Sequence, residues 1–283
     1  MPWTDETTNL SLSISRLQTI QARSEIFDSY GQKCNHRFLL NYGFAVEQNV
    51  ETDGFCPNEV PLEVTLSEAD ILFERKLDFW CREDSPQIKR VRVCVSNNEN
   101  TKILFSMIRV IVADEKDLES IISSSDISGY ANTSGLGAAT LRNNSALHMA
   151  LAYRTCRDIR FPISMRNEKG MLLHLLYVVR LALSNYPTTM AQDRESLSDE
   201  ISLPQFSNRR HAIIQVLGEK EVLHYFEDFA LSALQLIDIT DDDHFEAALK
   251  SLEGVKHFQI LRYCADSIGS LRRREQKRSR MDR

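Results

Sequence analysis

The stretch SEIFDSYGQKCNHRFLLNYGFAVEQN, residues 24–49, decides how the rest of the chain is organised. It contains two tyrosine–glycine pairs, which begin at Tyr30 and Tyr42 and enclose an apolar cluster. The glycine after Tyr30 suits a turn with positive φ, so Glu25–Tyr30 is predicted to be a short strand. Between the pairs, apolar residues recur with the spacing of one helical face, and the glycine after Tyr42 stands at a C-terminal cap position. This pattern predicts a helix over Cys34–Tyr42.

The composition narrows the functional classes. A chain of 283 residues with 42% hydrophobic and 26% charged content can bury the core of one large domain or two modest ones. A formal net charge of -6 argues against a protein that binds nucleic acid over its whole surface. The six cysteines form no Cys-x-x-Cys pair and no tight cluster with histidine, so the sequence predicts neither structural zinc nor a disulfide framework. We expect no metal, and an intracellular protein of the cytoplasm or nucleus, with a plastid left open. The longest apolar run, residues 171–183, is too short and too polar to cross a bilayer, so no membrane partner is expected.

Hydrophobic periods predict the elements that follow. Strand-like alternation covers Val60–Leu66 and Lys89–Val95, and Ser67 is placed to cap a helix that runs to Trp80, with Ile71 on its buried side. The apolar density after Lys102 predicts a helix that is buried on most sides. The leucines and isoleucines of residues 10–20 alternate in the same strand-like way.

The second half of the chain reads as helices. A helix opens at Asn167-Glu168, carries apolar residues around most of its surface, and ends before Pro187. Ser207–Leu217 and Glu219–Ile237 are predicted to be two helices because Gly218 interrupts the pattern. Beyond them, an acidic cap at 241–243 precedes one helix over Phe245–Ser270. The basic end from Arg272 is expected to be solvated and disordered, and a nuclear-import or acidic-partner tail is the alternative.

Two groups of motifs carry a resemblance to a known family. The order Y-G-x-x-x-N, a short helix, Y-G-F and an acidic or amide-rich step resembles the C-terminal end of the SET domain in methyltransferases of the Rubisco large-subunit methyltransferase class; here it is matched by Tyr30-Gly31, Asn35, Tyr42–Phe44 and Glu47–Asn49. Farther on, an Asn-Glu step before a long apolar helix, then Y-P-T-T with a nearby acidic residue, then L-G-E-K, resembles the helical substrate-binding domain of the same class. The two groups occur in the family's order and together span Ser24–Leu236.

The resemblance implies a protein-lysine methyltransferase that uses S-adenosyl-L-methionine and acts on a protein substrate. It implies that Tyr30 is the catalytic tyrosine, that Tyr42 lines the channel for the target side chain, and that Phe44 packs near the adenine of the cofactor. The residues by themselves leave another interpretation open, since an aromatic ring beside glycine commonly only buries area. Whether lysine or histidine is the target also stays open.

The family's asparagine–histidine motif and its glycine-containing cofactor motif are not found before Tyr30. We therefore expect the isolated chain to be inactive or nearly so, because an incomplete site cannot pre-organise the reaction. The predicted fold class is α+β, with a small β-containing SET remnant at residues 1–49, a mostly helical substrate-binding domain at 50–237, and an extra helix with a basic tail at 238–283. The competing hypothesis is a non-catalytic helical module that binds a partner protein.

Overall fold

The computed structural model describes residues 21, 23–25, 30–80, 87–96, 98–123 and 161–281. The chain divides into two compact units, Met1–Gly31 and Gln32–Arg283. The strands predicted at residues 10–20 and at 25–30 lie wholly or largely outside the described residues. All elements below belong to the second unit.

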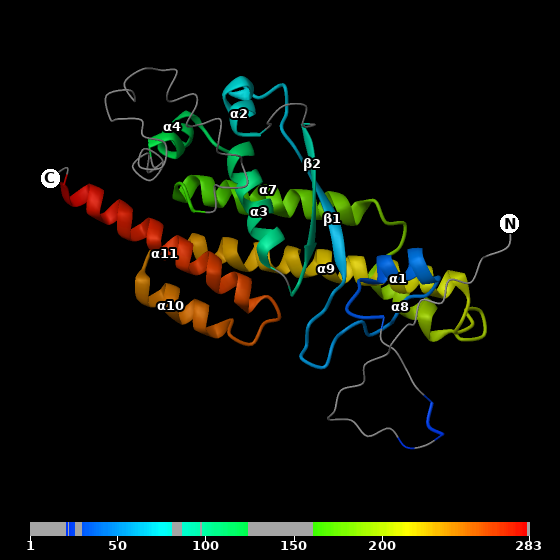
Figure 1. Cartoon of the computed structure of the whole chain (residues 1–283). Helices are drawn as coiled ribbons and strands as arrows, with labels where there is room; N and C mark the ends of the chain where they lie inside the picture. Colours follow the sequence, from blue (N-terminus) through cyan, green and yellow to red (C-terminus); the bar gives the residue numbers. More distant parts are fainter. Residues whose placement is uncertain are drawn as a thin grey trace. The chain divides into compact units, whose positions relative to one another are not determined.

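The second unit is mainly helical and contains a two-stranded antiparallel sheet, which confirms the predicted α+β class (Figure 1). Its described elements are, in chain order, α1 (Asn35–Tyr42), β1 (Glu59–Thr65), α2 (Phe73–Trp80), β2 (Ile88–Cys94), α3 (Asn98–Ile111), α4 (Glu115–Ser123), α7 (Met165–Ser184), α8 (Met190–Ser198), α9 (Asn208–Ile237), α10 (Asp242–Ser251) and α11 (Phe258–Met281).

The sheet covers the helices with one face. In β1 the alternate residues Val60, Leu62 and Val64 are buried while the residues between them face solvent. Leu62 lies opposite Val91 of β2 in the antiparallel register. The long helices α7 and α9 run beside each other and form the centre of the unit, with α3 packed against α7 and β2 (Figure 1). Apolar side chains from all these elements join one continuous core.

The helix α9 corrects the prediction of two helices separated by Gly218. It is continuous over 30 residues, and Gly218 lies buried inside it. A Cβ atom on Gly218 would lie 2.9 Å from Nδ2 of Asn58. The glycine therefore serves a close approach between α9 and the chain before β1, and it does not end the helix.

The start of α2 also differs from the prediction. Ser67 does not cap the helix, because its hydroxyl accepts a hydrogen bond from the amide of Ala69 in a preceding turn. A second turn follows, in which the Asp70 carboxylate accepts the amide of Leu72. The helix begins only at Phe73, and Ile71 remains 97% exposed, outside the buried face.

The C-terminal region differs in two ways. The single helix predicted over Phe245–Ser270 is two helices, α10 and α11, joined by a turn. The basic end, predicted to be disordered, continues α11 as far as Met281. Arginine, lysine, glutamate and glutamine are good helix formers, and the buried first half of α11 supplies the nucleus from which such a sequence continues.

Candidate functional site

Two of the predicted site residues, Tyr42 and Phe44, come together at the end of α1. Gly43 ends this helix with φ 79°, a left-handed cap that turns the chain back on itself. The ring of Phe44 consequently stacks on Phe38 at 5.1 Å between centroids, and the ring of Tyr42 lies 6.2 Å from that of Phe44. Tyr42 remains 45% exposed. We call Phe38, Tyr42 and Phe44 the aromatic edge.

The chain that leaves the aromatic edge is tied to its surroundings at once. Asn35, buried at the start of α1, holds Val46 from both sides: its Nδ2 donates to the Val46 carbonyl at 2.9 Å, and its Oδ1 accepts the Val46 amide at 2.8 Å. The neighbouring Ala45 amide donates to Nδ1 of His211 at 3.2 Å. Arg210 donates from Nε to the Glu47 carboxylate at 3.0 Å. Two of these three anchors come from the first turn of α9.

Tyr30, the predicted catalytic residue, belongs to the first compact unit, where its side chain is 54% exposed. The aromatic edge belongs to the second unit. The catalytic role of Tyr30 thus stays a prediction.

The Y-P-T-T and L-G-E-K motifs meet inside the helical domain. Lys220 of α9 is 2% exposed, and its ammonium donates to the Asp193 carboxylate at 2.5 Å and to the Thr188 carbonyl at 2.6 Å. The hydroxyl of Tyr186 donates to Glu219 at 2.8 Å, and burial together with this carboxylate raises the pKa of Tyr186 far above its usual range. These motif residues fasten the loop after α7 and the start of α8 to α9, which is an architectural role.

The Asn-Glu step also forms a buried network. Arg109 of α3 donates from Nε and Nη2 to the two carboxylate oxygens of Glu168, at 2.6 and 3.0 Å, and each side chain is 1% exposed. Burial lowers the pKa of Arg109, but the Glu168 carboxylate outweighs it, so the pKa is raised. Asn167 donates to the Arg109 carbonyl at 3.0 Å and to Asp117 at 3.2 Å.

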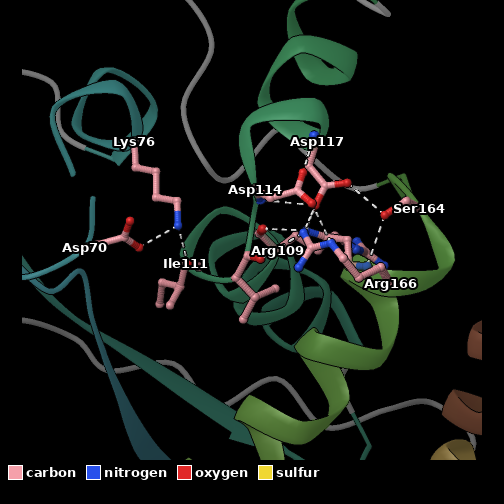
Figure 2. Close-up of polar contacts among 10 residues, drawn as sticks. Asp70, Lys76, Arg109, Ile111, Asp114, Asp117, Ser164 and Arg166 are labelled. Carbon is pink, nitrogen blue, oxygen red and sulfur yellow. Dashed lines mark hydrogen bonds and ion pairs between the residues drawn. The ribbon is translucent and has the colours of Figure 1, made fainter. Parts of the chain in front are cut away.

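Figure 2 shows how Asp117 joins this network to the start of α7, where Ser164 donates to the same carboxylate at 2.8 Å and Arg166 forms an ion pair with it. In the same view Lys76 of α2 reaches across to Asp70, at 2.6 Å, and to the Ile111 carbonyl at the end of α3, at 2.7 Å. The sequence analysis had identified the Asn-Glu step as a helix start and as part of the family resemblance, but not as part of a buried ion pair. The available signal was Arg109, a charged residue inside an apolar run.

One face of α7, a helix with apolar residues around most of its surface, is exposed to solvent. Leu173, Tyr177 and Leu181, spaced four residues apart, are each at least half exposed. Together with Leu176, Arg180 and Ser184 they line a shallow groove. We call Leu173, Tyr177 and Leu181 the α7 stripe. Contiguous exposed apolar residues of this kind mark candidate protein-contact surfaces.

A cleft lies between α8, α9 and the residues that follow the aromatic edge. Its lining includes Glu47 and Gln48, Arg194 and Leu197 of α8, and Glu221 of α9. Arg194 forms an ion pair with Glu221 at 3.0 Å, so the cleft presents both charge signs to solvent.

The aromatic edge by itself fits only part of S-adenosylmethionine. Tyr42 and Phe44 keep exposed ring surface on which an adenine can pack, whereas Phe38 is buried, and the three rings offer no cation for the cofactor's carboxylate and no carboxylate for its ribose. Among the described residues, no three histidine, cysteine, aspartate or glutamate side chains are arranged to hold a metal ion. Likewise, no helix in the described ranges combines the length and apolar character that crossing a membrane requires.

The sequence matches a known protein family and several characterised methyltransferases. Residues 67–223 match the family described as Rubisco LSMT substrate-binding. Over 208 residues the chain is 25% identical to the actin-histidine N-methyltransferase of Rattus norvegicus, covering 73% of this chain and 30% of that protein. An N-lysine methyltransferase of Xenopus laevis is 22% identical over 224 residues, which cover 73% of this chain and 43% of that protein. The chain thus spans less than half the length of these curated relatives.

Solved structures similar to the chain include Rubisco LSMT bound to sinefungin and monomethyllysine, with a TM-score of 0.49 and 18% identity, covering 87% of this chain and 49% of that one. Another is Rubisco LSMT bound to AdoMet, with a TM-score of 0.46 and 19% identity over 78% of this chain and 43% of that one. The family match covers more than half of the sequence and takes in α2 to α8, the first half of α9 and both networks of buried charges. By this match the chain belongs to the Rubisco LSMT substrate-binding family, and over this region it is similar to SET-domain protein methyltransferases.

Proposed function

We propose that the chain is the C-terminal part of an S-adenosylmethionine-dependent protein methyltransferase, and that its helical domain recognises the protein substrate. The observation that carries this proposal is the attachment of the aromatic edge to α9. The residues that resemble the end of a SET domain are fastened to α9, the helix that also carries Lys220 of the L-G-E-K motif. A substrate gripped by the helical domain would thereby be held near the edge that lines the target channel.

Methyl transfer from a sulfonium to nitrogen is an in-line displacement, and it requires a neutral nitrogen held in line with the methyl group. A lysine amine has a reference pKa of about 10.4, so its site must desolvate it or place a cation nearby. In the proposal the Tyr30 hydroxyl lies beside the transferring methyl, Tyr42 lines the channel and Phe44 packs the adenine. Lysine is the target we propose. Histidine is tested beside it, because the similar proteins include an actin-histidine N-methyltransferase.

Because the aromatic edge fits only the adenine, the isolated chain is proposed to be inactive or nearly so. Calorimetric titration with S-adenosylhomocysteine tests this for the wild type, Phe44→Ala and Tyr30→Phe. Micromolar binding, about -8 kcal/mol, that weakens in Phe44→Ala would mean that the chain forms a cofactor pocket as it stands. No detectable binding by a folded chain would place the catalytic half outside it. Robust methylation of any protein by the chain alone would contradict the proposed inactivity.

Substrate recognition is tested separately. Purified actin is the first protein to try, because several relatives act on it by name. We expect saturable binding of a protein substrate without any cofactor. Equal binding of actin and of an unrelated acidic protein would contradict specific recognition of actin, and lysine-bearing candidates would then be titrated in the same way.

The α7 stripe favours a second candidate, a non-catalytic module that binds a partner protein. An exposed apolar row on a helix suits a protein contact and needs no methyl transfer. The coding sequence upstream of Met1 separates the two candidates. An in-frame asparagine–histidine motif there favours the enzyme. A partner protein that binds stably, but that the longest protein made from this gene never methylates, favours the module.

A further inference from the structure

Three consecutive residues after the aromatic edge are each held by a different side chain. The Ala45 amide donates to His211, Val46 is clamped by Asn35, and Glu47 accepts from Arg210. Phe44 directly precedes this run, so the position of its ring follows from the position of the run. The aromatic edge is therefore placed by its outgoing chain as well as by α1.

The three anchors differ in origin. Asn35 lies only 11 residues from Val46 and belongs to α1, so its clamp fixes the local shape of the turn. His211 and Arg210 are more than 160 residues away from their partners and belong to α9. Of the described contacts to Ala45, Val46 and Glu47, those from His211 and Arg210 join the run to the helical domain.

The Arg210 anchor is itself held in place, and the His211 anchor requires one tautomer of its ring. Arg210 is 7% exposed, and its Nη1 donates to the Leu197 carbonyl at 2.9 Å and to the Leu203 carbonyl at 3.3 Å, so the guanidinium is fixed from the α8 side before it reaches Glu47. His211 accepts a backbone N–H at Nδ1, which requires the tautomer without a proton on that nitrogen. Farther along α9, Gly218 admits Asn58, whose Oδ1 accepts the Asn35 amide at 3.1 Å.

We infer that His211 and Arg210 are positioning residues that set the place of the aromatic edge relative to the helical domain. The inference rests on the proposed function, because it concerns the edge that would line the target channel. Neither residue touches substrate in this scheme. His211 acts through the Ala45 backbone, which directly follows Phe44, and Arg210 acts through the Glu47 side chain three residues beyond Phe44.

The test compares His211→Leu with His211→Asn in the full chain. Asparagine offers an acceptor oxygen at the δ position and can replace Nδ1, whereas leucine leaves the Ala45 amide without an acceptor. Two readouts are used: hydrogen exchange of the Ala45 amide, and the ¹⁹F resonance of fluorotyrosine at position 42, assigned with Tyr42→Phe. We expect exchange about tenfold faster in His211→Leu, a shifted or broadened Tyr42 resonance, and return of both towards wild type in His211→Asn.

An unchanged Ala45 exchange rate and an unchanged Tyr42 resonance in His211→Leu would overturn the inference. The same holds if His211→Asn gives the same exchange rate and resonance as His211→Leu. Glu47→Ala provides a second route if His211→Leu fails to fold, since Glu47 is half exposed and its removal releases the Arg210 anchor without opening the core. An unmoved Tyr42 resonance in Glu47→Ala would remove Arg210 from the inference. These readouts need neither cofactor nor substrate. If the wild-type chain binds no protein substrate but Tyr42 responds as expected in the variants, the result counts against the proposed function and not against the positioning role.

Discussion

The interior of the helical domain and the junction between α1 and α9 are held by different chemistry. In the interior, charges are buried in pairs: Arg109 with Glu168, and Lys220 with Asp193. At the junction, amides and an imidazole hold the chain, and the ion pair of Arg210 with Glu47 has a half-exposed carboxylate. A buried charge that loses its partner costs far more than a neutral hydrogen bond near solvent. The buried pairs of the interior therefore contribute most to the stability of the helical domain, whereas the junction sets the position of the aromatic edge relative to that domain.

The comparison predicts its largest effect at Glu168. Glu168→Ala leaves the Arg109 guanidinium buried without a carboxylate, and we expect a loss of about 3–5 kcal/mol in the free energy of unfolding. Urea denaturation measures it. The matched control is Glu63→Ala, which breaks the exposed pair with Arg90 on the sheet, where the side chains are 49% and 72% exposed, and which we expect to cost at most about 1 kcal/mol.

A double variant sharpens the same prediction. Replacing both partners, as in Arg109→Met with Glu168→Leu, removes the buried charges together, and such replacements are often neutral or stabilising. Equal losses in Glu168→Ala and Glu63→Ala would show that burial does not set the strength of these pairs. A double variant as unstable as Glu168→Ala would show that the cost does not come from an unpaired charge.

The sequence predicted what depends on local pattern. A helix was predicted over Cys34–Tyr42, one residue longer than the observed Asn35–Tyr42, because apolar spacing and a glycine cap lie within ten residues. Both strands were predicted because alternation is visible in a single strand. The pairing of Arg109 with Glu168 was not, because 59 residues separate the two and either residue alone reads as an ordinary polar position in a helix.

At Gly218 the local pattern predicted a helix break that the tertiary structure does not contain. A glycine between two apolar helical runs normally weakens a helix, so local reasoning placed an interruption there. Only the tertiary structure reveals that Asn58 approaches the α9 backbone at this point. The anchors of the aromatic edge were missed for the same reason, since no local pattern around His211 or Arg210 predicts a contact with residues 45–47.

Gly218→Ala tests whether the junction is packed as closely as the interior. Its Cβ would lie 2.9 Å from Asn58 Nδ2, and Asn58 is held by Asn35 and Asn49, so the side chain cannot simply move aside. We expect a net loss of about 1–3 kcal/mol from overpacking, measured by denaturation, although alanine normally favours a helix.

The control for Gly218→Ala is Gly269→Ala in α11. There the nearest atom to a new Cβ is the end of the Arg273 side chain at 3.5 Å, which is ordinary contact. We expect this variant to gain up to about 1 kcal/mol from helix propensity. If both glycines responded alike, the close approach at the junction would not be a determinant of stability.

The pH dependence of stability tests whether the phenol of Tyr225 is buried. Burial raises the pKa of Tyr225 from its ordinary value of 10.0 to about 12, and the charge of Cys94 adds to the rise. A folded-state pKa above the unfolded value means that the contribution to stability is complete below pH 10 and is lost as pH rises towards 12. Tyr225→Phe should therefore lose less stability than wild type between pH 10 and pH 12, while both behave alike between pH 7 and pH 9. Parallel curves throughout would contradict the burial of the phenol.

The smallest change in the free energy of unfolding is expected for a substitution on the α7 stripe. A variant there can therefore lose binding without losing stability. Tyr177→Ala removes a side chain that is 61% exposed, so the free energy of unfolding should change by about 0.5 kcal/mol or less. Leu172→Ala, on the buried face of the same helix, should cost about 2–5 kcal/mol. If the stripe grips a protein, Tyr177→Ala loses affinity for it while its denaturation curve stays that of the wild type. Unchanged affinity in Tyr177→Ala, for a protein that the wild type does bind, would direct the search for the binding surface to the cleft beside Glu47 and Arg194.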